Sequence, residues 1–275
     1  MVYSRVYLEL TNICNKNCSF CHGTKREPQM LSPDNFQKIT DNLVGVTDYL
    51  YFHLMGEPLL HPDLEYFIKT ATEKGFKVAI TTNGTLLNSQ KDMLLNSGVY
   101  KISISLHSFE KGDENEFCGY INSAVEFAKE SSDRGILTVF RLWNEGCDGG
   151  RNTVILEMLK SSLQGEWKSG GKGYRIKNKL HLEFGERFAW PDKDLEDISD
   201  NVFCYGLKDH FGILVDGTVV PCCLDCEGNI PLGNVLREDI NEILSSDRAA
   251  DMRRGFMERK PTESLCRKCG YATRF

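Results

Sequence analysis

The chain has 275 residues, of which 41% are hydrophobic and 26% are charged, and its net charge is −6. This content is sufficient for one substantial core and a small additional domain. The acidic balance argues against a nucleic-acid-binding face, and no apolar run approaches the ~20 residues that cross a bilayer. We therefore expect no nucleic-acid or membrane partner. The N-terminal residues lack the apolar segment of a signal peptide, so we expect a cytoplasmic location.

The first element is a predicted strand over residues 2–10, rich in β-branched and aromatic residues. Cys14, Cys18 and Cys21 follow it at once, in a C-x3-C-x2-C spacing that is too tight for a set of disulfides. Three thiolates can bind three irons of a [4Fe-4S] cube and leave the fourth iron open, whereas a closed zinc site needs a fourth ligand nearby. The spacing therefore favours an iron–sulfur cluster that receives a further ligand.

Short apolar runs and amphipathic segments then alternate along the chain. We expect strands at 49–54, 76–82, 99–106, 137–142 and 180–184, and helices at 32–43, 62–74, 88–96, 122–134 and 152–161. Such alternation predicts parallel strands with right-handed crossovers, in an α/β barrel or an open doubly wound sheet. The glycine-rich segment 164–179 is predicted to be a mobile loop. Residues 191–201 are predicted to be an irregular connection.

The cysteine motif and its place after the first strand resemble the hallmark of the radical S-adenosylmethionine (SAM) superfamily. Gly56-Glu57-Pro58, at the end of the second predicted strand, is similar to that superfamily's Gly-Gly-Glu-Pro motif, with Met55 in place of the first glycine. The resemblance implies a partial (β/α)6 TIM-like barrel over residues 1–190. It also implies that SAM binds the open iron of the cluster.

Further site residues follow from the same resemblance. Gly56 and Glu57 would hold the amino group of SAM, Asn83 would contact its ribose, and Ser103 and Ser105 would project from the fourth strand toward it. Arg141 would face the SAM carboxylate, although a surface salt bridge is the alternative. His107 stands where relatives commonly have Asp, so it is a candidate for substrate contact or for a structural hydrogen bond.

The eleven cysteines gather at the two ends of the chain, and in the cytoplasm they are better explained as metal ligands than as disulfides. The C-terminal set resembles the twitch domain, a shortened SPASM domain, over residues 191–275. That resemblance implies a second, closed [4Fe-4S] cluster on Cys204, Cys222, Cys266 and Cys269. A zinc ribbon that uses Cys223 and Cys226 with Cys266 and Cys269 is the alternative. Asp216-Gly217 predicts a hairpin, and helices are expected at 239–244 and 248–255.

The resemblance implies an enzyme in which the reduced cluster cleaves SAM and the resulting 5′-deoxyadenosyl radical abstracts a hydrogen atom from the substrate. Cluster reduction implies a ferredoxin or flavodoxin partner. We expect no peptide-recognition domain before Val2, which favours a small-molecule substrate, either a nucleotide or a sugar-like compound.

The overall layout is also similar to radical SAM queuine lyases, which implies cleavage of queuosine 5′-phosphate to release queuine. His181 and Glu183, on the sixth predicted strand, would then bind the substrate or move protons. Three alternatives stay open at this point: a SPASM-type peptide maturase, a radical alcohol dehydrogenase, and a non-catalytic zinc or iron–sulfur protein.

Overall fold

The computed structural model describes residues 2–275. Six parallel strands form the centre of one sheet, in the order β1-β2-β3-β4-β5-β8. Their bounds are Arg5–Leu8 (β1), Tyr49–Phe52 (β2), Lys77–Thr82 (β3), Lys101–Ser105 (β4), Leu137–Glu145 (β5) and Leu180–Glu186 (β8). Each of these strands overlaps a predicted one, so the expected parallel α/β sheet is confirmed.

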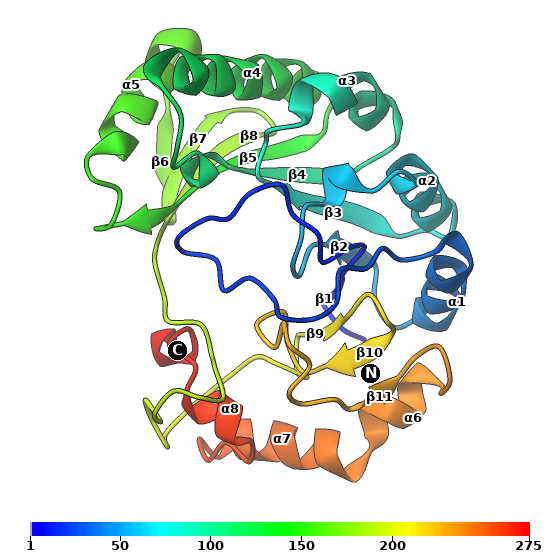
Figure 1. Ribbon diagram of the computed structural model, residues 1–275. Helices are drawn as coiled ribbons and strands as arrows, with labels where there is room; N and C mark the ends of the chain where they lie inside the picture. The colour runs from blue at the N-terminus through cyan, green and yellow to red at the C-terminus, as the bar shows by residue number, and fades with distance from the viewer. Residues whose placement is uncertain (1) are drawn as a thin grey trace.

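Five helices connect these strands and lie along the outer face of the curved sheet (Figure 1). They are α1 (Pro33–Leu43), α2 (Leu64–Glu73), α3 (Leu87–Asn96), α4 (Glu114–Asp133) and α5 (Arg151–Ser162). The inner face surrounds an open space, and the long loop after β1 crosses its mouth. This arrangement is a partial barrel with helices outside.

The local sequence explains where α1 begins and how β1, α1 and α2 pack together. Ser32 caps α1, where its hydroxyl accepts a hydrogen bond from the Asn35 amide at 3.2 Å, and Pro33 occupies the first turn. The buried face of α1 includes Phe36, which stacks on Phe67 of α2 with ring centroids 4.2 Å apart. In β1, Val6 and Leu8 are fully buried beneath the helices. The alternate residues of β1 therefore face the lumen of the partial barrel.

Two predictions about local structure were wrong. The segment 164–179 contains a β-hairpin, β6 (Lys168–Gly170) and β7 (Gly173–Lys177), which extends the sheet beyond β8. The turn uses Gly171 at φ +57°, and its many glycines and lysines hid the strand pattern. Helix α4 begins eight positions before the predicted start, because Asp113 and Glu116 form a capping box there.

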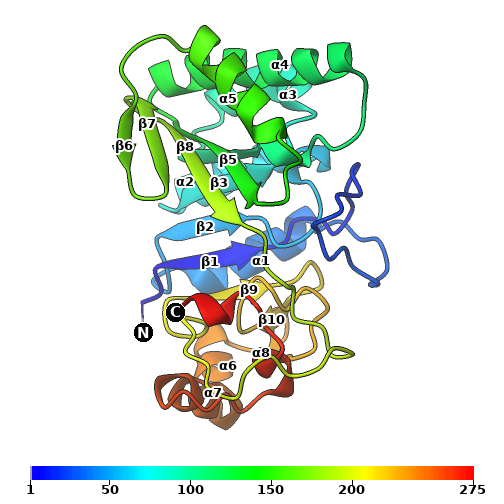
Figure 2. The ribbon, with the colours of Figure 1, turned by 90° about the vertical axis from the view of Figure 1, so that its left-hand side faces the viewer.

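The C-terminal segment continues the sheet on its other side. Strand β9 (His210–Ile213) pairs in parallel with β1, and β10 (Thr218–Val220) and β11 (Gly233–Asn234) follow in antiparallel order. The hairpin predicted at Asp216-Gly217 joins β9 to β10. Helices α6 (Ile240–Ser245), α7 (Asp247–Met257) and α8 (Ser264–Arg267) cover this end of the molecule (Figure 2). Within residues 2–275, no helix is both long enough and apolar enough to cross a membrane.

Candidate active site between two cysteine clusters

The loop after β1 brings three thiols together. Cys14 and Cys21 are exposed and Cys18 is partly buried, and the amide of Cys21 donates to the Cys18 carbonyl at 3.1 Å. Burial, together with the charges of Glu110, Cys21 and Cys14, raises the pKa of the Cys18 thiol to about 12. Three neighbouring thiols would repel one another as free thiolates, but a bound cation compensates their charge. This donor set therefore fits an iron–sulfur cluster with three protein ligands.

The Gly56-Glu57 segment lies directly against the cluster loop. The Glu57 amide donates to the Ile13 carbonyl at 2.9 Å, and Gly56 has φ +74°. A Cβ at Gly56 would lie 2.2 Å from the Thr11 carbonyl oxygen, so only glycine permits this approach. The two sequence motifs thus form one continuous site.

The Glu57 carboxylate is buried and points into the protein. It accepts hydrogen bonds from the amides of Leu59 at 3.0 Å and Asn83 at 2.7 Å, and burial raises its pKa. The Asn83 side chain in turn donates to Asn15 Oδ1 at 2.8 Å, and its Nδ2 lies 3.8 Å from Cys14 Sγ. Glu57 therefore ties the end of β3 to the cluster loop.

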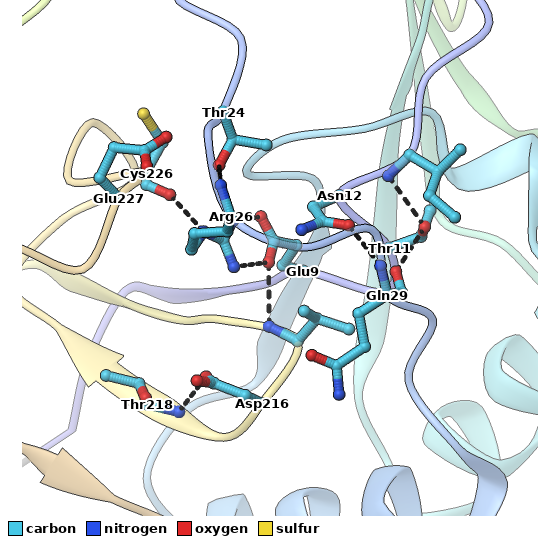
Figure 3. A network of polar contacts seen from close by, with 12 residues as sticks. Glu9, Thr11, Asn12, Thr24, Arg26, Gln29, Asp216, Thr218, Cys226 and Glu227 are labelled. Atoms are coloured by element: carbon cyan, nitrogen blue, oxygen red, sulfur yellow. Dashed lines mark hydrogen bonds and ion pairs between the residues drawn. The ribbon is translucent and has the colours of Figure 1, made fainter.

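A second polar network anchors the other side of this loop (Figure 3). Arg26 donates to both carboxylate oxygens of the buried Glu9, at 2.6 and 2.9 Å, and its Nε donates to the Cys226 carbonyl at 2.8 Å. Glu9 also accepts a hydrogen bond from the Val215 amide at 2.9 Å. The cluster loop, β1 and the C-terminal segment are therefore held by one ion pair.

Four thiols gather in the C-terminal segment, those of Cys204, Cys222, Cys266 and Cys269, and together they line one small cavity. Burial raises the pKa of each thiol, and the charges of Cys223 and of the other three cysteines also raise that of Cys222. Four free cysteines at one buried place, with no disulfide among the described residues, fit a closed four-ligand cluster.

The two remaining cysteines of this region point elsewhere. Cys223 lines the large central cavity, near Tyr7 and Arg5. Cys226 lies by the cluster loop, where its Sγ is 3.8 Å from the Gly23 carbonyl and within 4.8 Å of ligand atoms of His22 and Glu227. The four cysteines of the alternative zinc ribbon are thus not gathered at one place.

The central cavity, of about 930 Å³, extends from the cluster loop to the C-terminal thiols. Its lining includes Cys21 at one end and Cys204, Cys222 and Cys269 at the other. Ser105, Arg141 and His107 contribute to its wall, whereas Ser103 is buried beside it. A molecule in this cavity lies between the two groups of cysteines.

The candidate catalytic residues occupy different places. His107 is part of the main cavity, where its Nδ1 is 3.0 Å from the Arg141 carbonyl, and burial lowers its pKa to about 4. His181 and Glu183 line a second cavity beside the β6–β7 hairpin, and Glu183 lies 3.9 Å from Arg141 Nε. Only His107 of the three therefore faces the central cavity.

Sequence profiles identify both halves of this site. The profile described as the Radical SAM superfamily matches residues 8–140, and SPASM, described as an iron-sulfur cluster-binding domain, matches residues 204–270. The chain is a radical SAM enzyme with a C-terminal SPASM domain. A radical SAM domain binds SAM and a [4Fe-4S] cluster, and a SPASM domain binds additional iron–sulfur clusters.

Curated relatives match parts of this radical SAM enzyme. A probable GTP 3′,8-cyclase of Sulfurisphaera tokodaii is 32% identical over 134 residues, which are 46% of this chain and 42% of that protein. An S-adenosylmethionine-dependent nucleotide dehydratase of Selenomonas ruminantium is 35% identical over 91 residues, 32% of this chain and 33% of that protein. The chain thus spans less than half the length of either.

Solved structures resemble the whole chain. BtrN in complex with AdoMet and 2-DOIA has a TM-score of 0.63 at 19% identity, covering 98% of this chain and 93% of that one. Streptococcus suis SuiB bound to S-adenosylmethionine has a TM-score of 0.65 at 16% identity, covering 92% and 68%. These similarities establish the shared fold.

Sequence reasoning missed much of the cavity wall in this radical SAM enzyme. Arg5, Tyr7, Tyr51, His53 and His210 all line the cavity. The signal was present in β1, where Arg5 and Tyr7 alternate with buried Val6 and Leu8. The parallel pairing of β9 with β1, which adds His210, has no local signature.

Proposed function

We propose that this enzyme acts on a small phosphorylated nucleoside or sugar-like substrate, bound in the central cavity. The observation that carries the proposal is the continuity of that cavity, which touches Cys21 and three of the four candidate ligands of the auxiliary cluster. A volume of about 930 Å³ lies within the range of small-molecule sites. The names of the relatives, a GTP cyclase and a nucleotide dehydratase, support a nucleotide-like substrate.

The residues of the chain divide into two cofactor sites in this proposal. Cys14, Cys18 and Cys21 would hold the SAM-binding cluster, and the C-terminal four, Cys204, Cys222, Cys266 and Cys269, would hold the auxiliary cluster. SAM bound to the reduced first cluster supplies, on cleavage, the oxidising radical that removes a hydrogen atom from the substrate. An electron donor such as ferredoxin or flavodoxin is therefore required.

The protein contributes position and exclusion of water. Glu57 fixes the end of β3 and the Gly56 backbone, while Ser105 presents a polar group at the carboxyl end of β4 and Arg141 does so at the same level of β5. Parallel barrels carry their chemistry at these strand ends. His107, held by the Arg141 carbonyl, would contact the substrate or move a proton there, and the more remote His181 and Glu183 would act from the second cavity.

The specific reaction that we propose is cleavage of queuosine 5′-phosphate with release of queuine. Hydrogen abstraction from the ribose would lead to cleavage of its C–N glycosidic bond. The base would leave with the bonding electron pair and take up a proton lost by the sugar to give queuine, and the remaining sugar radical would take up one electron from the reduced donor and one proton. The aromatic side chains of Trp143 and Trp190 line the cavity and offer flat surfaces for a base.

The test incubates the reduced enzyme and SAM with queuosine 5′-phosphate and measures 5′-deoxyadenosine and free queuine by mass spectrometry. We expect both products in equal amounts, and neither from the variant with Cys14, Cys18 and Cys21 replaced by Ala. Formation of 5′-deoxyadenosine only at the substrate-free rate, with no released base, would refute the lyase reaction. Transfer of deuterium from a labelled peptide into 5′-deoxyadenosine would instead establish a peptide maturase.

A further inference from the structure

Unpartnered polar atoms concentrate at the central cavity. Within residues 2–275, six buried side-chain nitrogen or oxygen atoms have no hydrogen-bond partner. Four of them belong to residues that line this cavity: the Nε atoms of Arg5, Arg141 and Arg187, and Nδ1 of His210. Buried polar groups without partners are rare because each costs free energy. The wall of the cavity therefore carries donors that no protein acceptor within the described residues matches.

Arg5 is the most isolated of the three arginines. Arg141 lies 3.9 Å from Glu183, and Arg187 lies 3.5 Å from Glu110, but Arg5 forms no ion pair with any residue that the structure describes. Its guanidinium sits instead beside the rings of Tyr7 and Tyr51, at 5.9 and 5.8 Å from their centroids. Aromatic faces stabilise and orient a guanidinium but do not neutralise it. Arg5 is thus held in place with its charge unmatched.

Two residues near Arg5, namely His210 and Lys101, add a further hydrogen-bond donor and a further cation. His210 pairs with Arg5 in the β1–β9 register, and its ring lies 5.5 Å from that of Tyr7. Lys101 is on the lumen face of β4, at the level of Tyr7 in the strand register, but is not among the residues that line the cavity. It forms no ion pair among residues 2–275 and lies close enough to Arg5 for the two charges to interact. The region therefore gathers cations and donors from three strands.

The positive charges of Arg5, Arg141 and Lys101 contribute to the lowered pKa values of the neighbouring histidines. Burial, with a smaller contribution from the charge of Arg5, lowers the pKa of His210 to about 4. Burial also lowers the pKa of His53 to about 3, with contributions from Arg141 and Lys101. Both histidines are therefore neutral near pH 7, so the positive charge rests on the arginines and on Lys101. The carboxylate of Glu183 lies 3.9 Å from Arg141 Nε, and its charge also acts on Lys101, where it opposes the lowering of the pKa by burial and by Arg141.

We propose that Arg5, with His210 and Lys101, forms a binding site for the phosphate monoester of the substrate. A phosphate dianion matches two unpaired cations, and its oxygens accept from the Arg5 fork and from His210. This inference rests on the proposed function in one respect, that the substrate is phosphorylated. The site is distinct from the place expected for SAM, because Arg5 begins β1, whereas Gly56 and Asn83 follow the carboxyl ends of their strands and Ser105 is the last residue of β4.

The arrangement also orients the substrate. From Arg5 to Leu8 the strand rises by about 10 Å toward the cluster loop. A phosphate at Arg5 would therefore direct the rest of the substrate along the cavity, toward the strand ends where SAM is expected. The subsite thus acts in binding and orientation and does not take part in the chemical step.

The experiment measures binding by calorimetry under anaerobic conditions, with both clusters reconstituted and SAM saturating. The probes are ribose 5-phosphate, ribose and inorganic phosphate. We expect ribose 5-phosphate to bind at least about tenfold more tightly than ribose, because charge-assisted hydrogen bonds to phosphate are strong. Arg5→Gln should remove this preference, and Arg134→Gln, on the surface beside Glu130, should retain it.

Iron content reports whether each variant is folded. If Arg5→Gln loses its clusters, Lys101→Met serves as a second variant and should weaken inorganic phosphate binding about threefold to tenfold. Equal binding of ribose and ribose 5-phosphate by the unaltered enzyme, or an unchanged preference in folded Arg5→Gln, would overturn the proposal. Phosphate-selective binding without turnover of queuosine 5′-phosphate would refute the lyase reaction and leave this subsite standing.

Discussion

Arg26 and Glu9 form a two-pronged ion pair inside the protein, and the Glu9 side chain has no exposed surface. This ion pair binds the cluster loop both to β1 and to the C-terminal segment. The Glu9 carboxylate also accepts a hydrogen bond from the Val215 amide, and Arg26 also donates one to the Cys226 carbonyl. A buried pair of this kind adds little net stability over an apolar pair, but its loss on one side leaves an uncompensated charge. The pair therefore fixes the loop at a specific place.

We predict that Arg26→Leu lowers the free energy of unfolding by about 3–5 kcal/mol, because it leaves the Glu9 carboxylate buried and unpaired. Chemical denaturation of the reconstituted enzyme measures this loss. Arg134→Gln breaks an exposed pair with Glu130 and should cost less than about 1 kcal/mol. The double variant Glu9→Met with Arg26→Leu should recover part of the stability, and equal losses for the single and double variants would contradict this explanation.

Iron content tests the ligand assignment. The enzyme should hold about eight irons, and replacing Cys14, Cys18 and Cys21 together by Ala should leave about four. Cys222→Ala should also leave about four irons, whereas its neighbour variant Cys223→Ala and the more distant Cys226→Ala should keep all of them. Tightly bound zinc in anaerobically purified protein, with no iron at the C-terminal site, would refute the auxiliary cluster.

Glu57→Gln should weaken SAM binding while both clusters remain. The Glu57 carboxylate accepts from the amides of Leu59 and Asn83, and the NH2 group of glutamine cannot replace an acceptor there. One backbone donor is then unsatisfied, at a cost of about 1–3 kcal/mol, and the SAM-binding strand end shifts. Equilibrium binding of SAM measures the effect, and an unchanged affinity would show that Glu57 has no part in the site.

His210 predicts a specific pH dependence of stability. Its pKa is about 4 in the folded protein against 6.5 for an ordinary histidine, so the unfolded chain binds the proton first as the pH falls. Stability is therefore full above the ordinary pKa and is lost as the pH falls from 6.5 toward 4. For this one group the loss between pH 7.5 and pH 5.5 is about 1 kcal/mol.

His210→Gln should remove that part of the pH dependence. Thermal unfolding of both proteins at the two pH values measures the difference, and effects of acid on the clusters are common to both. Identical slopes for the two proteins would show that the folded pKa of His210 is not depressed.

The sequence predicted those parts of the fold that have local or periodic signals. The strands at 77–82 and 101–105 stand out as apolar runs, and α1 stands out because Ser32 and Pro33 mark its start. The hairpin at 168–177 was missed because glycine and lysine dominate it. The pairing of β9 with β1 was missed because parallel register depends on residues more than 200 positions apart.

The residues of the site likewise fall into those that the sequence reveals and those that only the assembled fold reveals. Closely spaced motifs such as Cys14-x3-Cys18-x2-Cys21 can be recognised in the sequence, because the cluster that they bind requires that spacing. Arg5, Tyr7 and His210 were not identified, since a lumen position is defined only when the strands are assembled. Cys222 and Cys223 are neighbours in sequence and both line the central cavity, but only Cys222 also lines the small cavity with Cys204, Cys266 and Cys269.

The parallel pairing of β9 with β1 has a consequence for how the two cofactor regions depend on each other. Without the C-terminal segment, β1 would be an exposed edge strand with unpaired backbone groups, a position that promotes aggregation. The strand that leads into the cluster loop is therefore completed by residues about 200 positions later in the chain. β1 gains its second pairing partner only when β9 is in place, so the C-terminal segment also supports the strand that carries the SAM site.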